Sequence, residues 1–123
     1  MVGGFLAGLR DGKVLGVRTA GGRVLCPPLE YDPATGEAVA DGFVELGPEG
    51  VLRAWAWVPE PMRKHPLDHP FAWALVQMEG ADTALLHALD APREAISSGM
   101  RVRVRWREER TGHITDIACF EPA

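Results

Sequence analysis

Residues 101–107 read R-V-R-V-R-W-R, and this stretch decides the fold class of the 123-residue chain. Arginine occupies every odd position, and Val102, Val104 and Trp106 stand between the arginines. Successive side chains of a β-strand point to opposite faces, so this alternation predicts a strand with one buried and one solvated face. We expect the three apolar residues to point inward and the arginines to form an outward row.

Four other apolar runs, set off by glycine or proline, predict further strands around this one. Ala91–Ile96, with proline near its start, predicts one or two helical turns. Five strands with a helical element between the third and the fourth is the order of an OB-fold barrel. We therefore predict a mostly β protein with an OB-fold-like barrel over residues 41–123. Its strands are expected at Val51–Val58, Phe71–Met78, Thr83–Leu89, Arg101–Arg107 and His113–Phe120.

Two segments at the start of the predicted barrel domain add detail to this prediction. The run Gly42–Leu46 is assigned to it, ahead of a turn at residues 47–50. Strict alternation along Val51–Val58 predicts that both faces of that strand are covered. One face would carry Leu52, Ala54, Ala56 and Val58, and the other would carry Arg53, Trp55 and Trp57.

Residues 1–40 are rich in glycine and proline and show little periodicity. Phe5–Leu9 predicts a short helical or irregular lead-in. Lys13–Val17 and Arg23–Leu25 predict two small strands joined by a glycine-containing turn. We therefore assign residues 1–40 to a small ribbon-like hairpin element that precedes the barrel.

Charge and cysteine content narrow the function classes. Thirteen basic residues against 17 acidic ones give a net charge of −4, which argues against a general polyanion binder. Cys26 and Cys119 are too few for a disulfide framework or a four-thiolate metal site. The apolar runs are too short to span a bilayer, and no basic region precedes the apolar start of the chain. We expect a cytoplasmic protein with no membrane partner.

The arginine row is the clearest chemical feature. Arg101, Arg103 and Arg105 share one strand face, where they could meet the phosphates of a nucleotide or of nucleic acid. The alternative is a solvated face whose arginines pair with carboxylates. The candidate carboxylates are Glu108, Glu109, Asp116 and Glu121.

Tryptophans and one proline-rich loop suggest a second surface. Trp55 and Trp57 could line a groove or a partner interface, although core packing is the alternative for each. The loop over residues 59–70 contributes Arg63, His65 and His69 and leads into Phe71, and we expect it to contact a ligand or a partner. Two histidines near a carboxylate could bind a metal, but the prolines of this loop oppose the helix that such a pair needs, so no metal site is predicted.

The inventory for catalysis is poor. Ser97 and Ser98 are the only serines and have no histidine near them in sequence, and the two cysteines are expected to be buried. A stand-alone enzyme is therefore not expected.

Several stretches together resemble a known family. They are F-L-A-G-L-R-D-G-K-V-L-G at 5–16, G-R-V-L-C-P-P at 22–28, G-P-E-G-V at 47–51, H-P-F-A-W-A-L-V-Q-M-E-G at 69–80 and G-M-R-V-R-V at 99–104. In order and spacing they resemble the family called domain of unknown function 35, over nearly the whole chain. The resemblance implies a rubredoxin-like zinc ribbon followed by an acyl-CoA-associated OB-fold. It also implies an accessory subunit that pairs with a thiolase-like enzyme of lipid, sterol or polyketide-type metabolism.

The chain departs from that family where zinc would bind. The positions of the two Cys-x-x-Cys knuckles fall on Arg18, Gly21, Asp32 and Thr35, and none is cysteine. A structural zinc site takes four ligands, so we expect the ribbon to be degenerate and zinc to be absent.

Three functions therefore stand side by side. The first is a non-catalytic accessory subunit of a thiolase-like enzyme that contributes to acyl-CoA binding. The second is an OB-fold protein that binds single-stranded nucleic acid, which the negative charge disfavours. The third is an enzyme acting alone. The sequence does not decide whether the chain forms a homo-oligomer.

Overall fold

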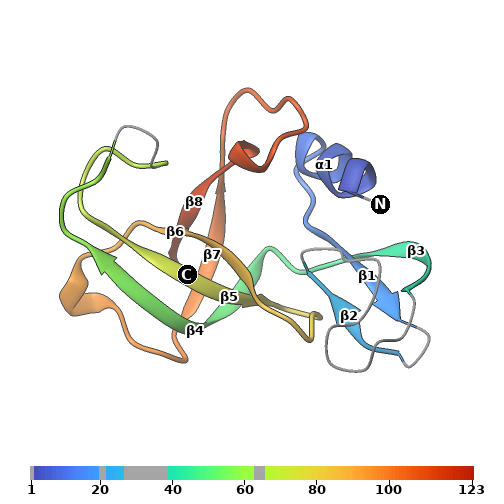
Figure 1. Ribbon diagram of the computed structural model, residues 1–123, viewed down its shortest axis with the longest axis horizontal. Helices are drawn as coiled ribbons and strands as arrows, with labels where there is room; N and C mark the ends of the chain where they lie inside the picture. The colour runs from blue at the N-terminus through green and yellow to red at the C-terminus, as the bar shows by residue number, and fades with distance from the viewer. Residues whose placement is uncertain (1, 20–21, 27–38, 63–65) are drawn as a thin grey trace.

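The computed structural model describes residues 2–19, 22–26, 39–62 and 66–123. Most of this chain is β-structure, in a closed five-stranded barrel and a separate three-stranded sheet, and Figure 1 shows the two side by side. The predicted mostly β fold with an OB-fold-like barrel is confirmed. The barrel strands are β4 (Glu49–Val58), β5 (Phe71–Met78), β6 (Leu85–Leu89), β7 (Arg101–Trp106) and β8 (Ile117–Pro122).

The barrel closes in the order β4-β5-β6-β8-β7, with β7 returning to β4. Every pair is antiparallel except β6 and β8, which run parallel and meet at Leu89 and Phe120. A short 3₁₀ helix, η1 (Arg93–Ala95), lies between β6 and β7, where the helical turns were predicted. A second one, η2 (Ile114–Asp116), leads into β8.

The small sheet has the order β2-β1-β3, with β1 (Leu15–Thr19) in the centre and β2 (Val24–Leu25) and β3 (Val39–Glu45) beside it. The expectation that Gly42–Leu46 belongs with the barrel region is wrong, because β3 pairs with β1 and not with a barrel strand. An apolar run shows that a strand forms but not which neighbour it finds, since pairing depends on tertiary contacts. The small sheet therefore extends beyond the predicted division at residue 40.

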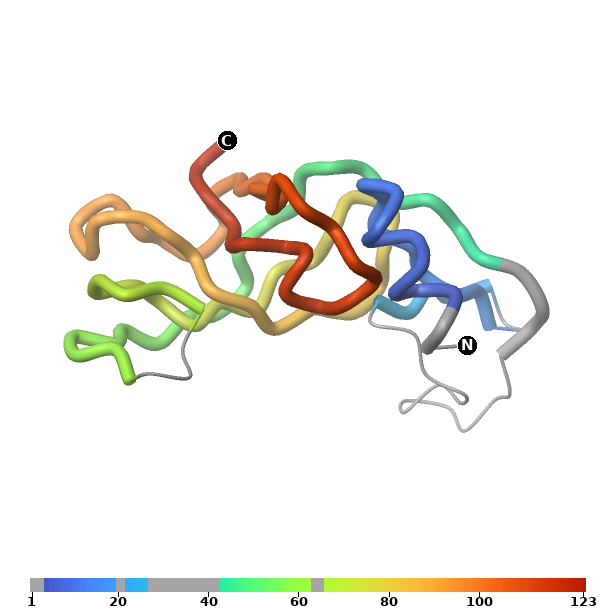
Figure 2. Tube along the Cα trace, turned by 90° about the horizontal axis from the view of Figure 1, so that it is seen from above, coloured from blue at the N-terminus to red at the C-terminus, as the bar shows by residue number. Residues whose placement is uncertain are grey.

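A helix, α1 (Val2–Arg10), covers the junction between the two sheets, and Figure 2 shows it lying against the β7–β8 loop. Phe5 and Leu9 on this helix are buried. The Arg110 Nε in that loop donates a hydrogen bond of 3.1 Å to the Arg10 carbonyl oxygen, at a helix end where carbonyls lack partners. The lead-in predicted over Phe5–Leu9 is thus a helix.

Strand β4 contains a β-bulge that decides which side of the barrel its tryptophans face. Leu52 pairs with Val76 and Ala54 with Leu75, so Arg53 is an extra residue without a partner on β5. Because an extra residue reverses the alternation beyond it, Leu52 lies on the same side as the tryptophans that follow. The strict alternation expected for this strand is therefore wrong. Leu52 is buried and the two tryptophans at 55 and 57 pack against the core, whereas Ala54 and Ala56 are exposed.

One glycine lets three strands approach closely. Gly50 pairs with Met78 on β5 and with Val102 on β7. A Cβ at this position would come within 2.7 Å of the Gln77 carbonyl oxygen and of a Val76 methyl group. Glycine therefore permits the close backbone approach at which the barrel closes.

The two sheets share one hydrophobic core. Core residues of the small sheet and helix, such as Leu9 and Val24, form one cluster with barrel residues such as Val76 and Phe120. Backbone contacts join the same parts: the Asp82 amide donates to the Val24 carbonyl oxygen, and the Val24 amide donates to a carboxylate oxygen of Asp82. The ribbon-like sheet is thus an integral part of the folded unit.

Candidate functional site

The arginine row has the predicted orientation, because Arg101, Arg103 and Arg105 are 54%, 57% and 44% exposed. Their guanidinium groups are not open to solvent on all sides. The Arg101 Nε lies 3.0 Å from an oxygen of Glu49, and an Arg101 amino group lies 3.4 Å from Glu79. These hydrogen bonds raise the pKa of Arg101.

One carboxylate connects the other two arginines of the row. Glu121 on β8 accepts a hydrogen bond of 2.8 Å from Arg103 and one of 2.7 Å from Arg105. The bonds from Arg103 and Arg105 lower the pKa of Glu121. Arg105 also donates to Asp90 over 2.9 Å. Of the predicted carboxylate partners Glu121 is confirmed, and the donors of the row are largely occupied.

The proline-rich loop is attached to this charge network through His69. The His69 Nε2 lies 2.8 Å from Asp90, and its Nδ1 lies 3.3 Å from Asp68. The hydrogen bond with Asp90 is the main cause of a raised pKa for His69. Burial opposes the shift at Asp90, but hydrogen bonds from His69 and Arg105 lower its pKa overall. The chain of contacts therefore runs from the loop to β6, β7 and β8.

Three residues of the predicted loop surface, Arg63, His65 and Phe71, have different outcomes. Arg63 and His65 lie outside the described residues. Phe71 is fully buried, so the expectation that its side chain meets a ligand or partner is wrong for the isolated protein. Its side chain belongs to a small cluster with Ala88 and Cys119, against which Leu67 of the loop packs.

Trp55 and Trp57 pack against the barrel core, and Trp55 also lines a hollow on the outer face of the sheet. Both are partly buried and pack against the main hydrophobic cluster. The bulge at Arg53 turns both toward the core, so the core alternative describes Trp57, whereas Trp55 contacts the core and the outer hollow. Trp106 also packs against this cluster, as predicted for the inward face of the arginine strand.

The outer face of the β4–β6 sheet carries an apolar hollow that the sequence analysis missed. It has a volume of about 230 Å³. Leu75 on β5 and its pairing partner Leu86 on β6 are 39% and 57% exposed. The signal in the sequence is that Phe71–Met78 is apolar at nearly every position, so one side of it had to face outward. The hollow is lined by Ala54, Trp55, Ala56, Trp73, Leu75 and Leu86.

A second hollow of about 230 Å³ adjoins the first, because Trp73 and Leu86 line both. The polar atoms at its edge come from Arg107, His87 and Thr115. His87 is 6% exposed, and burial is the main cause of its lowered pKa. This hollow is lined by Pro66, Trp73, Leu86, His87, Arg107, Ile114, Thr115 and Ile117.

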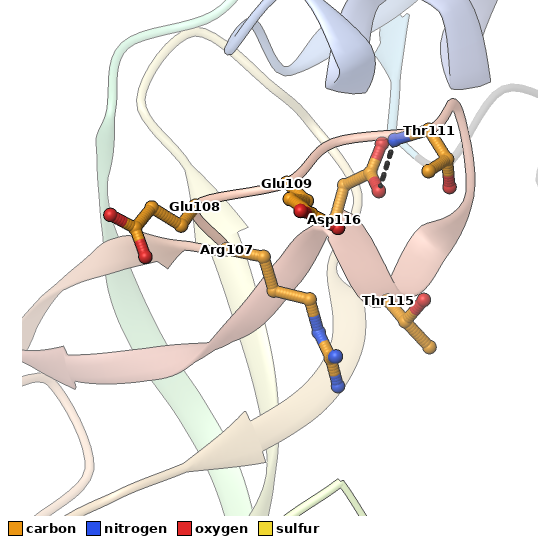
Figure 3. A pocket seen from close by; sticks show the side chains of 6 residues that line it. All are labelled: Arg107, Glu108, Glu109, Thr111, Thr115 and Asp116. Carbon is orange, nitrogen blue, oxygen red and sulfur yellow. Dashed lines mark hydrogen bonds between the residues drawn. The ribbon is translucent and has the colours of Figure 1, made fainter.

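A third, polar hollow of about 410 Å³ lies on the β7–β8 loop (Figure 3), and Arg107 and Thr115 line it as well as the second. Asp116 at its base is buried and accepts hydrogen bonds from the amides of Thr111, Gly112 and His113. Burial opposes it, but these bonds lower the pKa of Asp116 overall. Asp116 thus holds the loop in shape, and Glu108 and Glu109 complete the lining.

Both thiols are buried, as predicted. Burial raises the pKa of Cys26 to about 12 and that of Cys119 to about 11. A thiol is a weak nucleophile unless it ionises, so neither is activated for catalysis. Among the described residues, no three side chains of His, Cys, Asp or Glu are grouped so that they could hold a metal ion. No helix in the same part of the chain is long and apolar enough to cross a membrane.

The chain matches a protein-family model and is similar in fold to solved structures. Residues 43–107 match the family model described as the C-terminal OB-fold domain of ChsH2. A solved structure named Ltp2–ChsH2(DUF35) aldolase has a TM-score of 0.67 and 21% sequence identity, covering 96% of this chain and 91% of that one. A protein of unknown function from the DUF35 family of Sulfolobus solfataricus has a TM-score of 0.70 and 15% identity, covering 98% and 83%. No curated protein matches the chain. At these identities the two solved structures show a shared fold.

Proposed function

Because the chain belongs to the family of the ChsH2 C-terminal OB-fold domain, we propose that it is a non-catalytic accessory subunit of an acyl-CoA enzyme. One solved structure of the same fold is named Ltp2–ChsH2(DUF35) aldolase. That name supports a role beside an enzyme. In this proposal the partner is thiolase-like, and the barrel holds it in position and contributes to its acyl-CoA site.

The observation that carries this proposal is the exposed apolar face of the barrel sheet. Leu75 and Leu86 project side by side from β5 and β6, and the hollow beside them has no charged side chain in its lining. Contiguous apolar patches of this kind mark interaction sites in soluble proteins. The depletion of charge is also what distinguishes the centre of a protein interface.

The chemistry of the described residues supports an accessory role. Cys26 and Cys119 are protonated and buried. His87 is buried, and its Nδ1 accepts a hydrogen bond from the Ala88 amide, so this nitrogen does not face a nucleophile. In the described part of the chain, His69 is hydrogen-bonded to two carboxylates and to no serine or cysteine. Nucleophilic catalysis needs a nucleophile within reach of a base, and these groups do not provide one.

The geometry does not favour the nucleic-acid alternative. Arg101, Arg103 and Arg105 already pair with carboxylates, so binding a phosphate would require these ion pairs to separate. Trp55 and Trp57 pack against the core and offer no open row of rings for base stacking.

Co-purification from the native host tests the proposed function. Tagged wild-type chain is expected to retain an acyl-CoA enzyme, identified by mass spectrometry and by its activity on an acyl-CoA substrate. Leu75→Asp places a charge in the apolar face and is expected to lower recovery of the enzyme at least tenfold. Ala95→Asp introduces the same charge on the exposed η1 turn and is expected to leave recovery unchanged.

Two results would contradict the proposal. One is recovery of nucleic acid in place of an enzyme, with salt-sensitive binding that Arg103→Glu abolishes. The other is equal recovery of the enzyme with the wild type and with Leu75→Asp, which would show that the enzyme does not bind this face.

A further inference from the structure

Arg107 differs from the three arginines that precede it in the row. Arg101, Arg103 and Arg105 each make an ion pair, whereas within the described ranges no carboxylate lies within ion-pair distance of the Arg107 guanidinium. Figure 3 shows its side chain extending away from Glu108 and Glu109. An exposed arginine with free donors is suited to a planar anion, because its parallel N–H groups match the two oxygens of a carboxylate.

The guanidinium stands at the boundary between a polar and an apolar surface. Arg107 and Thr115 line both the polar hollow on the β7–β8 loop and the second hollow. Beyond them the second hollow has walls of Trp73, Leu86 and Ile114. A ligand held by Arg107 would therefore have water on one side and apolar side chains on the other.

His87 in the lining of this hollow brings no charge into it near neutral pH. Burial lowers its pKa, and the positive charge of Arg107 lowers it further, while backbone hydrogen bonds to Ile114 and Ile117 oppose the shift. Because a neutral imidazole brings no charge into the hollow, an apolar group can lie against it without separating an ion from water.

The apolar surface continues past this hollow. Trp73 and Leu86 line both this hollow and the hollow beside Ala54 and Leu75, and each hollow has a volume of about 230 Å³. Together they form a furrow that begins at Arg107 and runs along the outer face of β5 and β6. A ligand that fills it needs one anionic end and an extended apolar body.

We propose that this furrow binds a carboxylate with an unbranched apolar tail, with the carboxylate on Arg107 and Thr115 and the tail along Trp73 and Leu86. The site is distinct from the arginines that pair with Glu121 and Asp90. It does not rest on the proposed function, because it needs no partner enzyme. The furrow shares Leu86 and the hollow beside Leu75 with the apolar face of that proposal, so a bound partner enzyme would compete with the ligand, and the titration uses the isolated chain.

Calorimetric titration of the full chain with octanoate at neutral pH tests the proposal. Octanoate is expected to bind with a stoichiometry of one. Butyrate, which lacks four methylenes, is expected to bind more than tenfold more weakly, since each buried methylene contributes about a fourfold change in affinity. Octanol has a similar tail but no charge and is also expected to bind at least tenfold more weakly.

Arginine variants locate the site. Arg107→Gln is expected to weaken octanoate binding at least tenfold, and Arg107→Lys to restore part of it, because a lysine keeps the charge without the paired donors. Arg103→Gln removes a cation from the same strand face and is expected to leave binding unchanged. Circular dichroism of each variant checks that the fold is retained.

Three results would overturn the proposal. They are no octanoate binding to the wild type, equal binding by wild type and Arg107→Gln, and octanol binding as tightly as octanoate. Octanoyl-pantetheine tests a second source of the same tail. If this thioester binds more tightly than octanoate and independently of Arg107, the furrow recognises acyl thioesters and the assignment of a free carboxylate is wrong.

Discussion

At the scale of single residues, the contact between His69 and Asp90 is the most sensitive to conditions. It joins the loop to the barrel, and Asp90 is in turn held by Arg105. The charged groups that face the His69 ring are Asp68 on its own loop and Asp90 at the end of β6, with Arg105 behind Asp90. Protonation of His69 therefore strengthens the attachment of the loop.

The pH dependence follows from the direction of the shift. Folding raises the pKa of His69 above its ordinary value of 6.5. The stabilisation that protonated His69 gives to the folded state is therefore complete below about pH 6.5 and is lost as pH rises through the raised pKa. Because the ring is about half exposed, we expect His69→Gln to cost only about 0.5 kcal/mol at pH 6. The same variant should cost close to nothing at about pH 9. Urea unfolding at both pH values measures the difference, and an equal cost at both would contradict the role of the charge.

At the scale of elements, the bulge in β4 controls the placement of the tryptophans. It adds Arg53 to the strand, so Leu52, Trp55 and Trp57 share the inner side although their spacing is not uniform. The bulge also leaves Arg53 on the surface, where its Nε donates a hydrogen bond of 2.7 Å to Gln77. Side-chain direction beyond residue 53 thus depends on one extra position.

Two single-residue deletions separate this effect from general damage to the strand. Deleting Arg53 removes the bulge but keeps Leu52 and Trp55 on the same side, so we expect a loss of about 1 kcal/mol. Deleting Ala56 leaves the bulge and turns Trp57 outward, so we expect a loss of about 3 kcal/mol or more. Urea unfolding of both variants gives the comparison. A larger loss for the Arg53 deletion would show that the bulge itself, and not the side it selects, stabilises the barrel.

These elements also show how much of the fold could be predicted from the sequence. The alternation of Arg101–Arg107 was sufficient to predict its two faces, because the irregularity in its pairing with β8 adds the extra residue to β8 and leaves the period of β7 intact. It was not sufficient for Val51–Val58, where one unpaired residue reverses the pattern. The furrow beside Arg107 was missed for a related reason: Trp73 and Leu86 lie on neighbouring strands and Ile114 lies in η2, and no local period in the sequence shows that they meet.

At the scale of the whole molecule, the small sheet and the barrel behave as one unit. They share a hydrophobic cluster, and the amide of Leu46 donates to the Val14 carbonyl oxygen across the predicted division. We expect a single thermal transition with equal calorimetric and van't Hoff enthalpies. Two resolved transitions in scanning calorimetry would show instead that residues 1–40 and 41–123 fold separately.

The same unit is expected to fold without zinc. Arg18, at one of the four positions where the family resemblance places a ligand, is an exposed residue of β1, and the other three positions lie outside the described residues. None of the four is cysteine, and arginine and glycine provide no zinc ligand. Elemental analysis of protein purified without chelator should find far less than one zinc per chain, and a chelator should leave the melting temperature unchanged. One tightly held zinc per chain would contradict this expectation.

The strand order has a consequence for synthesis on the ribosome. β8 lies between β6 and β7 in the barrel. The barrel therefore cannot close until residues up to Pro122 have emerged from the ribosome. Until β8 has been made, the nascent chain must keep an open sheet edge and the inner apolar side chains of β5 and β6, such as Val76 and Leu85, uncovered. Exposed edges and apolar strands of this kind are prone to aggregate, so synthesis is most vulnerable in the interval before β8 emerges.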